Sequence, residues 1–192
     1  MHPHLFRTYS HRGSAINPTI VEAVCATISV PSHFTPVEIG PPRRQQKFIG
    51  APLGVNNPTR ELLNEAGTAF GNERRVAQII SIGGGSSVPS LETEANEIGV
   101  DRLLKGVAAD CEMVARDLTV RLFNVEAYRR FNVEEMGNTE IDSWDGLGDI
   151  ESHTRSYIES GAVTKVLDIS LKCLRDKVGT ITLGRLSKCF DA

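Results

Sequence analysis

Apolar residues recur every three or four positions in several segments, which is the spacing of a helix with one apolar face. Asn17 and Pro18 supply a helix cap and a first-turn proline, and they predict a helix over residues 19–29. Pro31 would stop it. The apolar residues on one side of this helix are Ile20, Val24 and Ile28.

Asn57 and Pro58 repeat the cap-and-proline signal and predict a helix over residues 58–70 that stops at Gly71. Its core-facing residues are expected to be Leu62, Leu63, Ala66 and Phe70. Longer periodic segments predict further helices over residues 100–123, 150–158 and 162–174.

Strand signals fall between these helices. Residues 35–39 and 47–49 flank a Gly-Pro-Pro turn, and residues 128–133 contain the aromatic and β-branched residues that favour a strand. The run VAQIISI over residues 76–82 is densely apolar and ends in three glycines, which is typical of a strand buried on both faces of a parallel sheet. Residues 178–183 alternate weakly. Strands that alternate with helices predict an α/β fold with a mainly parallel sheet.

Composition excludes several classes of protein. The 192 residues are 40% hydrophobic and 23% charged, which is ordinary for a globular chain and unlike a disordered one. The net charge of −3 leaves no broad basic face, so we expect no nucleic-acid partner. The short basic pairs Arg43-Arg44, Arg74-Arg75 and Arg129-Arg130 indicate solvated surface, with contact to anionic lipid headgroups as the alternative.

The spacing of the cysteines and the N-terminal residues indicate no metal site, redox motif or signal peptide. The four cysteines form no C-x-x-C pair, so neither a zinc cluster nor a redox motif is indicated, and no metal or cofactor is expected. The start Met1-His2-Pro3-His4 lacks the charged and apolar parts of a signal peptide. We therefore expect a cytoplasmic protein, with peripheral contact to membranes as a further expectation.

Three segments carry a family resemblance. Residues 48–58 read FIGAPLGVNNP, which resembles the patatin-like phospholipase pattern F-[VI]-D-G-[GA]-L-x-x-N-N-P. Upstream, EAVCATISVPSHF over residues 22–34 is similar to the family's helix and its exit. Downstream, IISIGGG over residues 79–85 resembles the family's strand V-S-I-G-T-G. Later segments around RFNVE, Trp144 and His153 are similar to fungal members of the family.

The resemblance implies a three-layer α/β/α domain that hydrolyses lipid acyl esters with a serine and an aspartate. Residues 1–160 would be the C-terminal part of this domain, with its N-terminal strands missing, and residues 161–192 a helical or irregular tail. The family's serine lies in G-x-S-x-G and its oxyanion loop in D-G-G-G. Neither pattern occurs in this chain.

The resemblance also places the family's catalytic aspartate at position 50, where this chain has Gly50, followed by Ala51 and Pro52 in place of glycines. A glycine has no side chain that could accept a proton. The remaining residues that match the family's motifs are Phe48, Asn56, Asn57, Pro58, Gly83 and Gly85.

Simpler interpretations stand beside these. Asn57 and Pro58 are sufficient as a helix start, and Gly83 to Gly85 with two following serines could also cradle a phosphate, although no nucleotide-binding motif is complete. The acidic residues Asp142, Asp145, Asp149 and Glu151 match no calcium loop. His153 as a base, and His2 with His4 as metal ligands, lack the further groups that such sites need.

Two functions follow as hypotheses. In the first, the chain is a fragment of a patatin-like lipid acyl hydrolase that lacks the family's nucleophilic serine and catalytic aspartate. Such a chain would be inactive alone, a pseudoenzyme. In the second, the remaining α/β scaffold is a non-enzymatic interaction or regulatory module. A lipid or membrane surface is the expected partner, together with self-association through an exposed sheet edge.

Overall fold

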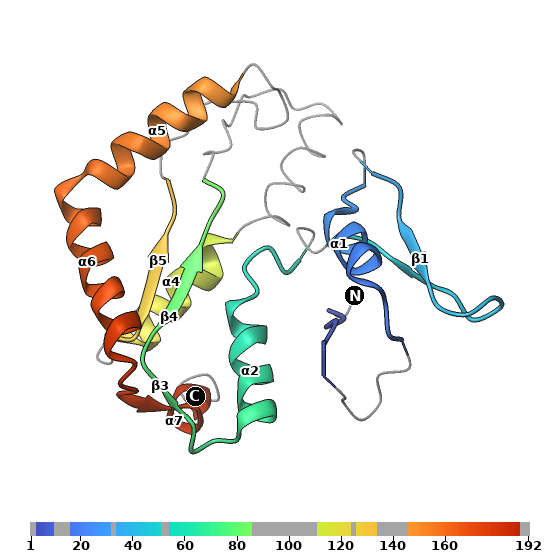
Figure 1. The fold of residues 1–192 in the computed structure, drawn as a ribbon, viewed down its shortest axis with the longest axis horizontal. Coiled ribbons are helices and arrows are strands. Elements are labelled where there is room, and N and C mark those ends of the chain that lie inside the picture. The colour runs from blue at the N-terminus through green and yellow to red at the C-terminus, as the bar shows by residue number, and fades with distance from the viewer. Residues whose placement is uncertain are drawn as a thin grey trace, which may run out of the picture. The chain divides into compact units, whose positions relative to one another are not determined.

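The computed structural model describes residues 3–9, 16–31, 34–50, 54–85, 111–123, 126–133 and 146–188. They fall into two compact units, the first holding the described residues up to Asn56 and the second those from Asn57 onward (Figure 1). The described part is a mixed α/β structure with three two-stranded sheets, of which one is parallel. The expected boundary near residue 160 stays a prediction.

The first unit packs one helix on one hairpin. Helix α1 (Ile20–Ile28) contacts strand β1 (Val37–Ile39), which pairs antiparallel with β2 (Gln46–Phe48). The two predicted strands are thus confirmed, each displaced by one or two residues. The small core consists of buried Ile16, Ala26 and Ile39, with partly buried Phe6, Val37 and Phe48 packed against them.

The N-terminus of α1 differs from the sequence prediction. Thr19 is the cap: its hydroxyl accepts a hydrogen bond from the Glu22 backbone at 3.2 Å, and the Glu22 carboxylate accepts one from the Thr19 backbone at 2.7 Å. This reciprocal pair is a capping box, and its hydrogen bonds with Thr19 lower the pKa of Glu22. The expectation that Asn17 caps this helix is therefore wrong.

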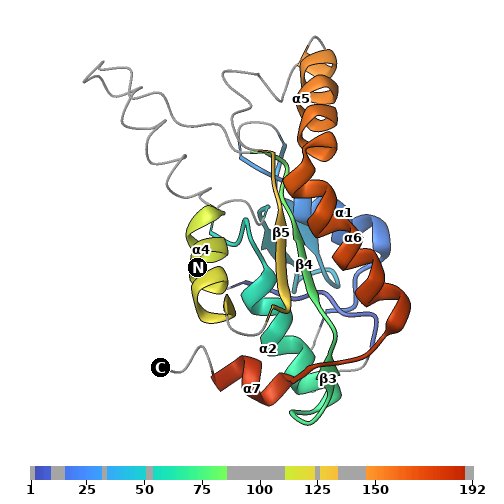
Figure 2. The same ribbon diagram turned by 90° about the vertical axis from the view of Figure 1, so that its left-hand side faces the viewer.

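The second unit is built on the parallel pair β4 (Ile79–Ile82) and β5 (Tyr128–Phe131). Ile79 lies opposite Tyr128 and Ile82 opposite Phe131. Helix α4 (Glu112–Arg121) lies between the two strands in sequence, as a parallel connection requires. Figure 2 shows α4 on one side of this pair and helix α6 (Gly161–Asp176) on the other.

The predicted strand over residues 76–82 is divided in two. Arg75–Val76 forms β3, which pairs antiparallel with β6 (Ile181–Thr182), and only Ile79–Ile82 enters the parallel pair. Burial alternates along β4: Ile79 and Ser81 are buried, whereas Ile82 is exposed. The strand is therefore covered on one face, and the expectation of burial on both faces is wrong for the described residues.

Helices close the core on the buried side. Helix α2 (Thr59–Phe70) and the short α7 (Leu183–Lys188) contact each other and surround Ile79. The buried core residues are Leu63, Ile79, Leu118, Leu122, Ala127, Ile181, Leu183 and Leu186. Of the residues predicted to face the core from α2, Leu63 is buried and Ala66 partly so, but Leu62 and Phe70 are exposed.

The C-terminal helices follow the prediction closely. Helix α5 (Leu147–Glu159) and α6 meet at Ser160, whose hydroxyl accepts a hydrogen bond from the Val163 backbone and caps α6. Gly71 ends α2 with a φ of 80°, a left-handed conformation that glycine adopts without strain. The described part of the helix predicted over residues 100–123 is α4; residues 100–110 lie outside the described residues.

Helix α6 leaves much of its apolar face in solvent. Leu171 and Leu174 are each more than half exposed, while Ser170 on the same helix is buried. Exposed apolar area of this kind promotes dye binding and association. We expect the chain to bind a hydrophobic fluorescent dye and to self-associate on a sizing column.

The double substitution Leu171→Gln with Leu174→Gln should reduce both effects and change the free energy of unfolding by less than about 1 kcal/mol, because these side chains gain little burial on folding. Lys165→Gln with Lys172→Gln on the charged side of α6 is the control and should change neither. A wild-type chain that runs as a monomer without binding dye would contradict this expectation.

Candidate functional site

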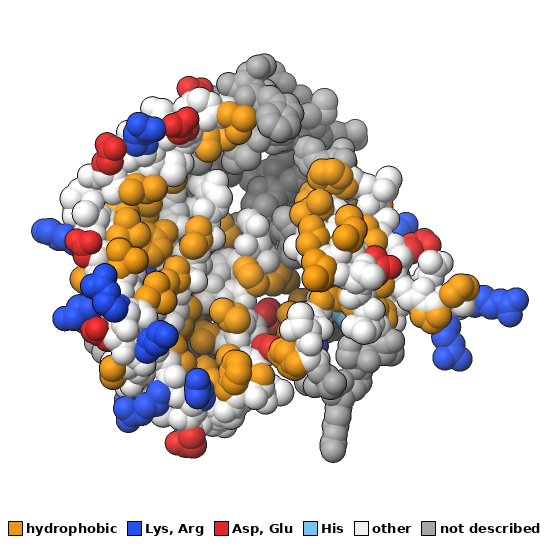
Figure 3. Space-filling model, in the orientation of Figure 1, with side chains coloured by type: hydrophobic (Ala, Val, Ile, Leu, Met, Phe, Trp, Pro, Cys, Tyr) orange, Lys and Arg blue, Asp and Glu red, His pale blue; other side chains and the backbone are white. Residues whose placement is uncertain are grey.

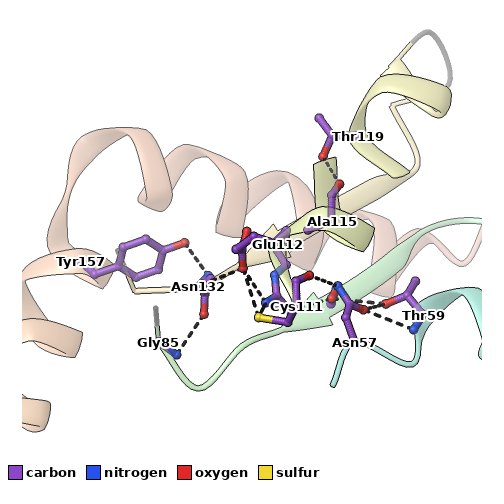
Figure 4. A network of polar contacts seen from close by, with 11 residues as sticks. Asn57, Thr59, Gly85, Cys111, Glu112, Ala115, Thr119, Asn132 and Tyr157 are labelled. Carbon is purple, nitrogen blue, oxygen red and sulfur yellow. Dashed lines mark hydrogen bonds and ion pairs between the residues drawn. The ribbon is translucent and has the colours of Figure 1, made fainter. Parts of the chain in front are cut away.

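Polar side chains meet at the carboxyl ends of β4 and β5, the edge at which parallel sheets usually hold their ligands. Ser81 of β4 lies opposite Arg130 of β5 in the strand register. Arg130 and Asn132 are two residues apart and so project from the same face of their strand. Glu112, the first residue of α4, and Tyr157 of α5 complete the group (Figure 4).

Arg130 is the centre of this group. Its two terminal nitrogens donate to Ser81 Oγ at 3.0 Å and to Glu112 Oε1 at 2.9 Å, and its side chain is only 12% exposed. Hydrogen bonds between charged partners are stronger than neutral ones, and burial makes them costly to break. The Nε atom of Arg130 is buried without a hydrogen-bond partner among the described residues.

Asn132 connects this ion pair to two further segments. Its Nδ2 donates to Glu112 Oε1 at 3.0 Å, and its Oδ1 accepts from the Gly85 backbone at 2.9 Å. The Asn132 backbone N–H donates to the Tyr157 hydroxyl at 3.2 Å. One asparagine thus joins α4, the turn after β4 and α5.

Gly83, the first glycine after β4, is required by this arrangement. A side-chain Cβ at Gly83 would lie 2.0 Å from Asn132 Oδ1 and 2.7 Å from a terminal nitrogen of Arg130. The backbone N–H groups of Gly83 and Gly85 already donate to Phe131 and Asn132. Two of the three N–H groups that could have cradled a phosphate therefore have acceptors within the protein, which favours the structural interpretation of these glycines.

Asn57 extends the group to α2. Its side-chain oxygen accepts hydrogen bonds from the backbone and the hydroxyl of Thr59, at 3.3 and 2.7 Å, and its Nδ2 donates to the Cys111 carbonyl at 3.2 Å. The helix itself begins at Thr59, one residue after Pro58, which occupies the cap position in the backbone. The prediction that Asn57 caps a helix beginning at Pro58 is therefore wrong in position, although the Asn57 side chain does bind the first residue of the helix.

The thiol of Cys111 is held as a poor nucleophile. Burial raises its pKa, a hydrogen bond to Glu112 raises it further, and the nearby charge of Arg130 opposes these effects only in part. A thiol must ionise to attack an electrophile. Ser81 is also engaged, since its hydroxyl oxygen accepts from Arg130 and lies 3.3 Å from that of Thr59.

In the first unit, Gly50 is packed against the end of α1. It is buried, and its backbone N–H donates to the Ser29 carbonyl at 2.8 Å. A Cβ at this position would lie 3.0 Å from the Thr27 carbonyl oxygen and 3.1 Å from the Val30 nitrogen. These neighbours are backbone atoms, which cannot rotate away. The close packing here therefore depends on Gly50 having no side chain.

The other motif residues have structural surroundings. The ring of Phe48 packs against those of His4 and Phe6, with centroids 5.3 and 5.2 Å apart, and Asn56 is exposed. Ala51 and Pro52 lie outside the described residues.

The alternative candidates do not assemble into sites where they are described. His153 is exposed on α5, and Glu151 pairs with Arg155 at 2.7 Å; His2, Asp142 and Asp145 lie outside the described residues. Within the described ranges no three His, Cys, Asp or Glu residues are placed to hold a metal ion.

Sequence reasoning missed the role of Glu112, Arg130 and Asn132. A signal was present, because Arg130 and Asn132 stand two residues apart in the predicted strand and so place polar groups on one face. The partner Glu112 is 18 residues from Arg130 on a different element. Only the fold brings them together.

Comparison with family models, with curated proteins and with solved structures found no match. Among the helices that the structure describes, none is both long and apolar enough to cross a bilayer.

A pair of glycine substitutions tests the group around Arg130. Gly83→Ala should lower the free energy of unfolding by about 1–3 kcal/mol, because the added methyl must displace Asn132 and break its hydrogen bonds to Glu112 and Gly85. Gly84→Ala is the matched control, since a Cβ there meets nothing within 4 Å, and it should change stability by less than about 0.5 kcal/mol. Urea unfolding measures both, and equal effects would contradict the interpretation.

Proposed function

We propose that this chain corresponds to the C-terminal part of a patatin-like α/β/α domain and that it does not hydrolyse acyl esters by itself. The order of the three motifs supports the family, and the parallel pair β4–β5 with helices on either side is compatible with it. The proposal places the chain in lipid metabolism by resemblance, as a non-catalytic relative of an ester hydrolase.

The packing of Gly50 is the observation that most directly supports the proposed absence of ester hydrolysis. Position 50 matches the family's aspartate, and a Cβ there would lie 3.0–3.1 Å from backbone atoms of Thr27, Ser29 and Val30. An aspartate at this position therefore requires the neighbouring backbone to shift by a few tenths of an ångström. The sequence change and the local packing support the same conclusion.

The carboxyl edge of β4–β5 supports this view independently. Its charged and polar groups, Arg130, Glu112 and Asn132, bind one another and hold four segments together. A catalytic edge instead presents groups toward a substrate, with a nucleophile beside a base. We infer that this edge serves as scaffold.

The second candidate function, a non-enzymatic interaction module, is favoured by the surface of α1. Its outward side carries Ile20, Val21 and Val24, each more than half exposed. Apolar side chains in a contiguous exposed patch are typical of a contact surface. Loss of catalysis and retention of a contact surface are compatible, and the two candidates describe one protein.

An ester-hydrolysis assay tests the proposal. The chain and its Gly50→Asp variant should both give background rates with aryl esters and phospholipids, because removing either member of a catalytic pair costs on the order of 10⁴- to 10⁶-fold in turnover. Gly50→Asp should also lower the free energy of unfolding by about 1–3 kcal/mol through overpacking. Gly161→Asp, in open space at the start of α6, should be neutral or slightly stabilising.

A gain-of-function arm tests the family itself. A patatin-like segment with the nucleophile and oxyanion loop is fused ahead of Leu5, together with Gly50→Asp, Ala51→Gly and Pro52→Gly. Turnover in this fusion, and none in the same fusion with Gly50 retained, supports the assignment. Serine-inhibitor-sensitive turnover by the unmodified chain, or inactivity of both fusions, would contradict it.

A further inference from the structure

Helix α1 presents its apolar side to solvent. At 100° per residue, Ile20, Val24, Ile28 and Val21 occupy one continuous arc of the helix, and their exposures are 82, 52, 47 and 70%. The buried residue of the helix, Ala26, lies on the opposite side. A surface helix normally has the reverse arrangement, with the apolar arc toward the core. The arc is therefore available for contact with another apolar surface.

The exposed arc continues into a groove. Residues 4–8 run beside α1, and the groove between them has a volume of about 470 Å³, with Ile20, Val24 and Ile28 in its wall. Leu5 and Phe6 line its other side. The arc and the groove thus form one apolar surface, which Figure 3 shows as hydrophobic side chains gathered over α1.

The β1–β2 hairpin of the same unit carries a basic tip. Arg44 N–H donates to the Pro41 carbonyl at 2.9 Å, which closes a four-residue turn with Pro42 and Arg43 at its centre. Arg43 has a φ of 73°, as the third residue of a type II turn requires, although glycine or asparagine usually fills that position. Arg43 therefore has a backbone conformation that is unfavourable for residues other than glycine and asparagine.

The tip arginines have no acidic partners in the described part of the molecule. Arg43 and Arg44 are exposed and make no ion pair there, whereas Lys47 on β2 lies opposite Glu38 of β1. Figure 3 shows basic side chains that project sideways from this hairpin, beside the apolar surface over α1. A strained, exposed arginine points to a role outside the fold itself.

We propose that the first unit binds the surface of an anionic lipid membrane, with the α1 arc and groove at the acyl boundary and Arg43 and Arg44 at the headgroups. Peripheral proteins combine these two elements, an exposed apolar helix face and nearby cations. An acidic protein partner would be matched by the arginines but would leave the wide apolar surface without a complement. The inference goes beyond the proposed function, because it needs neither hydrolysis nor the patatin-like fold.

Vesicle co-sedimentation tests this binding. The full chain should bind vesicles of phosphatidylcholine that contain phosphatidylserine, and bind pure phosphatidylcholine vesicles much more weakly. Arg43→Ala with Arg44→Ala should weaken binding about 30-fold, since each cation near an anionic surface contributes about fivefold in affinity. Lys165→Ala with Lys172→Ala on α6 removes the same charge from the second unit and should leave binding unchanged.

Single substitutions at Arg43 separate binding from folding. Arg43→Gly should weaken vesicle binding about fivefold and should not lower the melting temperature, because glycine adopts the positive φ without strain. Arg43→Lys keeps the charge and should keep the binding. Val21→Ser with Val24→Ser should weaken binding and leave the circular dichroism spectrum unchanged, since both side chains are exposed.

Three outcomes would overturn the proposal. They are failure of the wild-type chain to bind the anionic vesicles, an equal loss of binding in the Lys165 and Lys172 control, and full binding by the Val21 and Val24 variant. The last result, together with competition by soluble polyglutamate, would indicate an acidic protein partner instead.

Discussion

The ion pair between Arg130 and Glu112 is the interaction on which the second unit depends. It joins the second strand of the parallel pair to the start of α4, and Asn132 extends it to the turn after β4 and to α5. A guanidinium that is 12% exposed is costly to desolvate, so the pair stabilises the unit only while both partners and their neutral hydrogen bonds are present. The role of such a pair is to fix one arrangement of these segments.

Two close backbone approaches accompany this constraint. At Gly83 the absent side chain makes room for Asn132, and at Gly50 it makes room for the end of α1. In the first case a glycine allows a polar network to close. In the second it replaces the group that the patatin-like resemblance would require for catalysis. Both glycines allow close packing and neither supplies a reactive side chain, which is why we interpret the chain as a scaffold with a contact surface.

Much of the secondary structure could be predicted from the sequence. The helices α2, α5 and α6 and the strand β5 follow from local periodicity, which acts over a few residues. The start of α1 was missed because Asn17-Pro18 competes with Thr19, whose partner Glu22 completes a capping box. Periodicity was sufficient to predict that these elements exist, whereas competing cap residues left the start of α1 ambiguous.

Pairing over long sequence distances could not be predicted. Residues 76–82 read as one strand, yet Val76 pairs with Ile181 while Ile79 pairs with Tyr128, and no local pattern tells these partners apart. The outward side of α1 was also beyond sequence reasoning, because periodicity shows that a face is apolar and not which way it points. The same limit applies to Glu112, which is recognisable as a partner of Arg130 only in the folded chain.

A double-mutant cycle on Arg130 and Glu112 tests the central claim, that the carboxyl edge of the parallel pair is a structural network. Arg130→Met, Glu112→Gln and the double variant are compared with the wild-type chain by urea unfolding. The account predicts an interaction energy of about 1–3 kcal/mol between the two sites, with the double variant less destabilised than the sum of the single ones. Additive effects, with an interaction energy under about 0.3 kcal/mol, would contradict it and leave these groups free for another role.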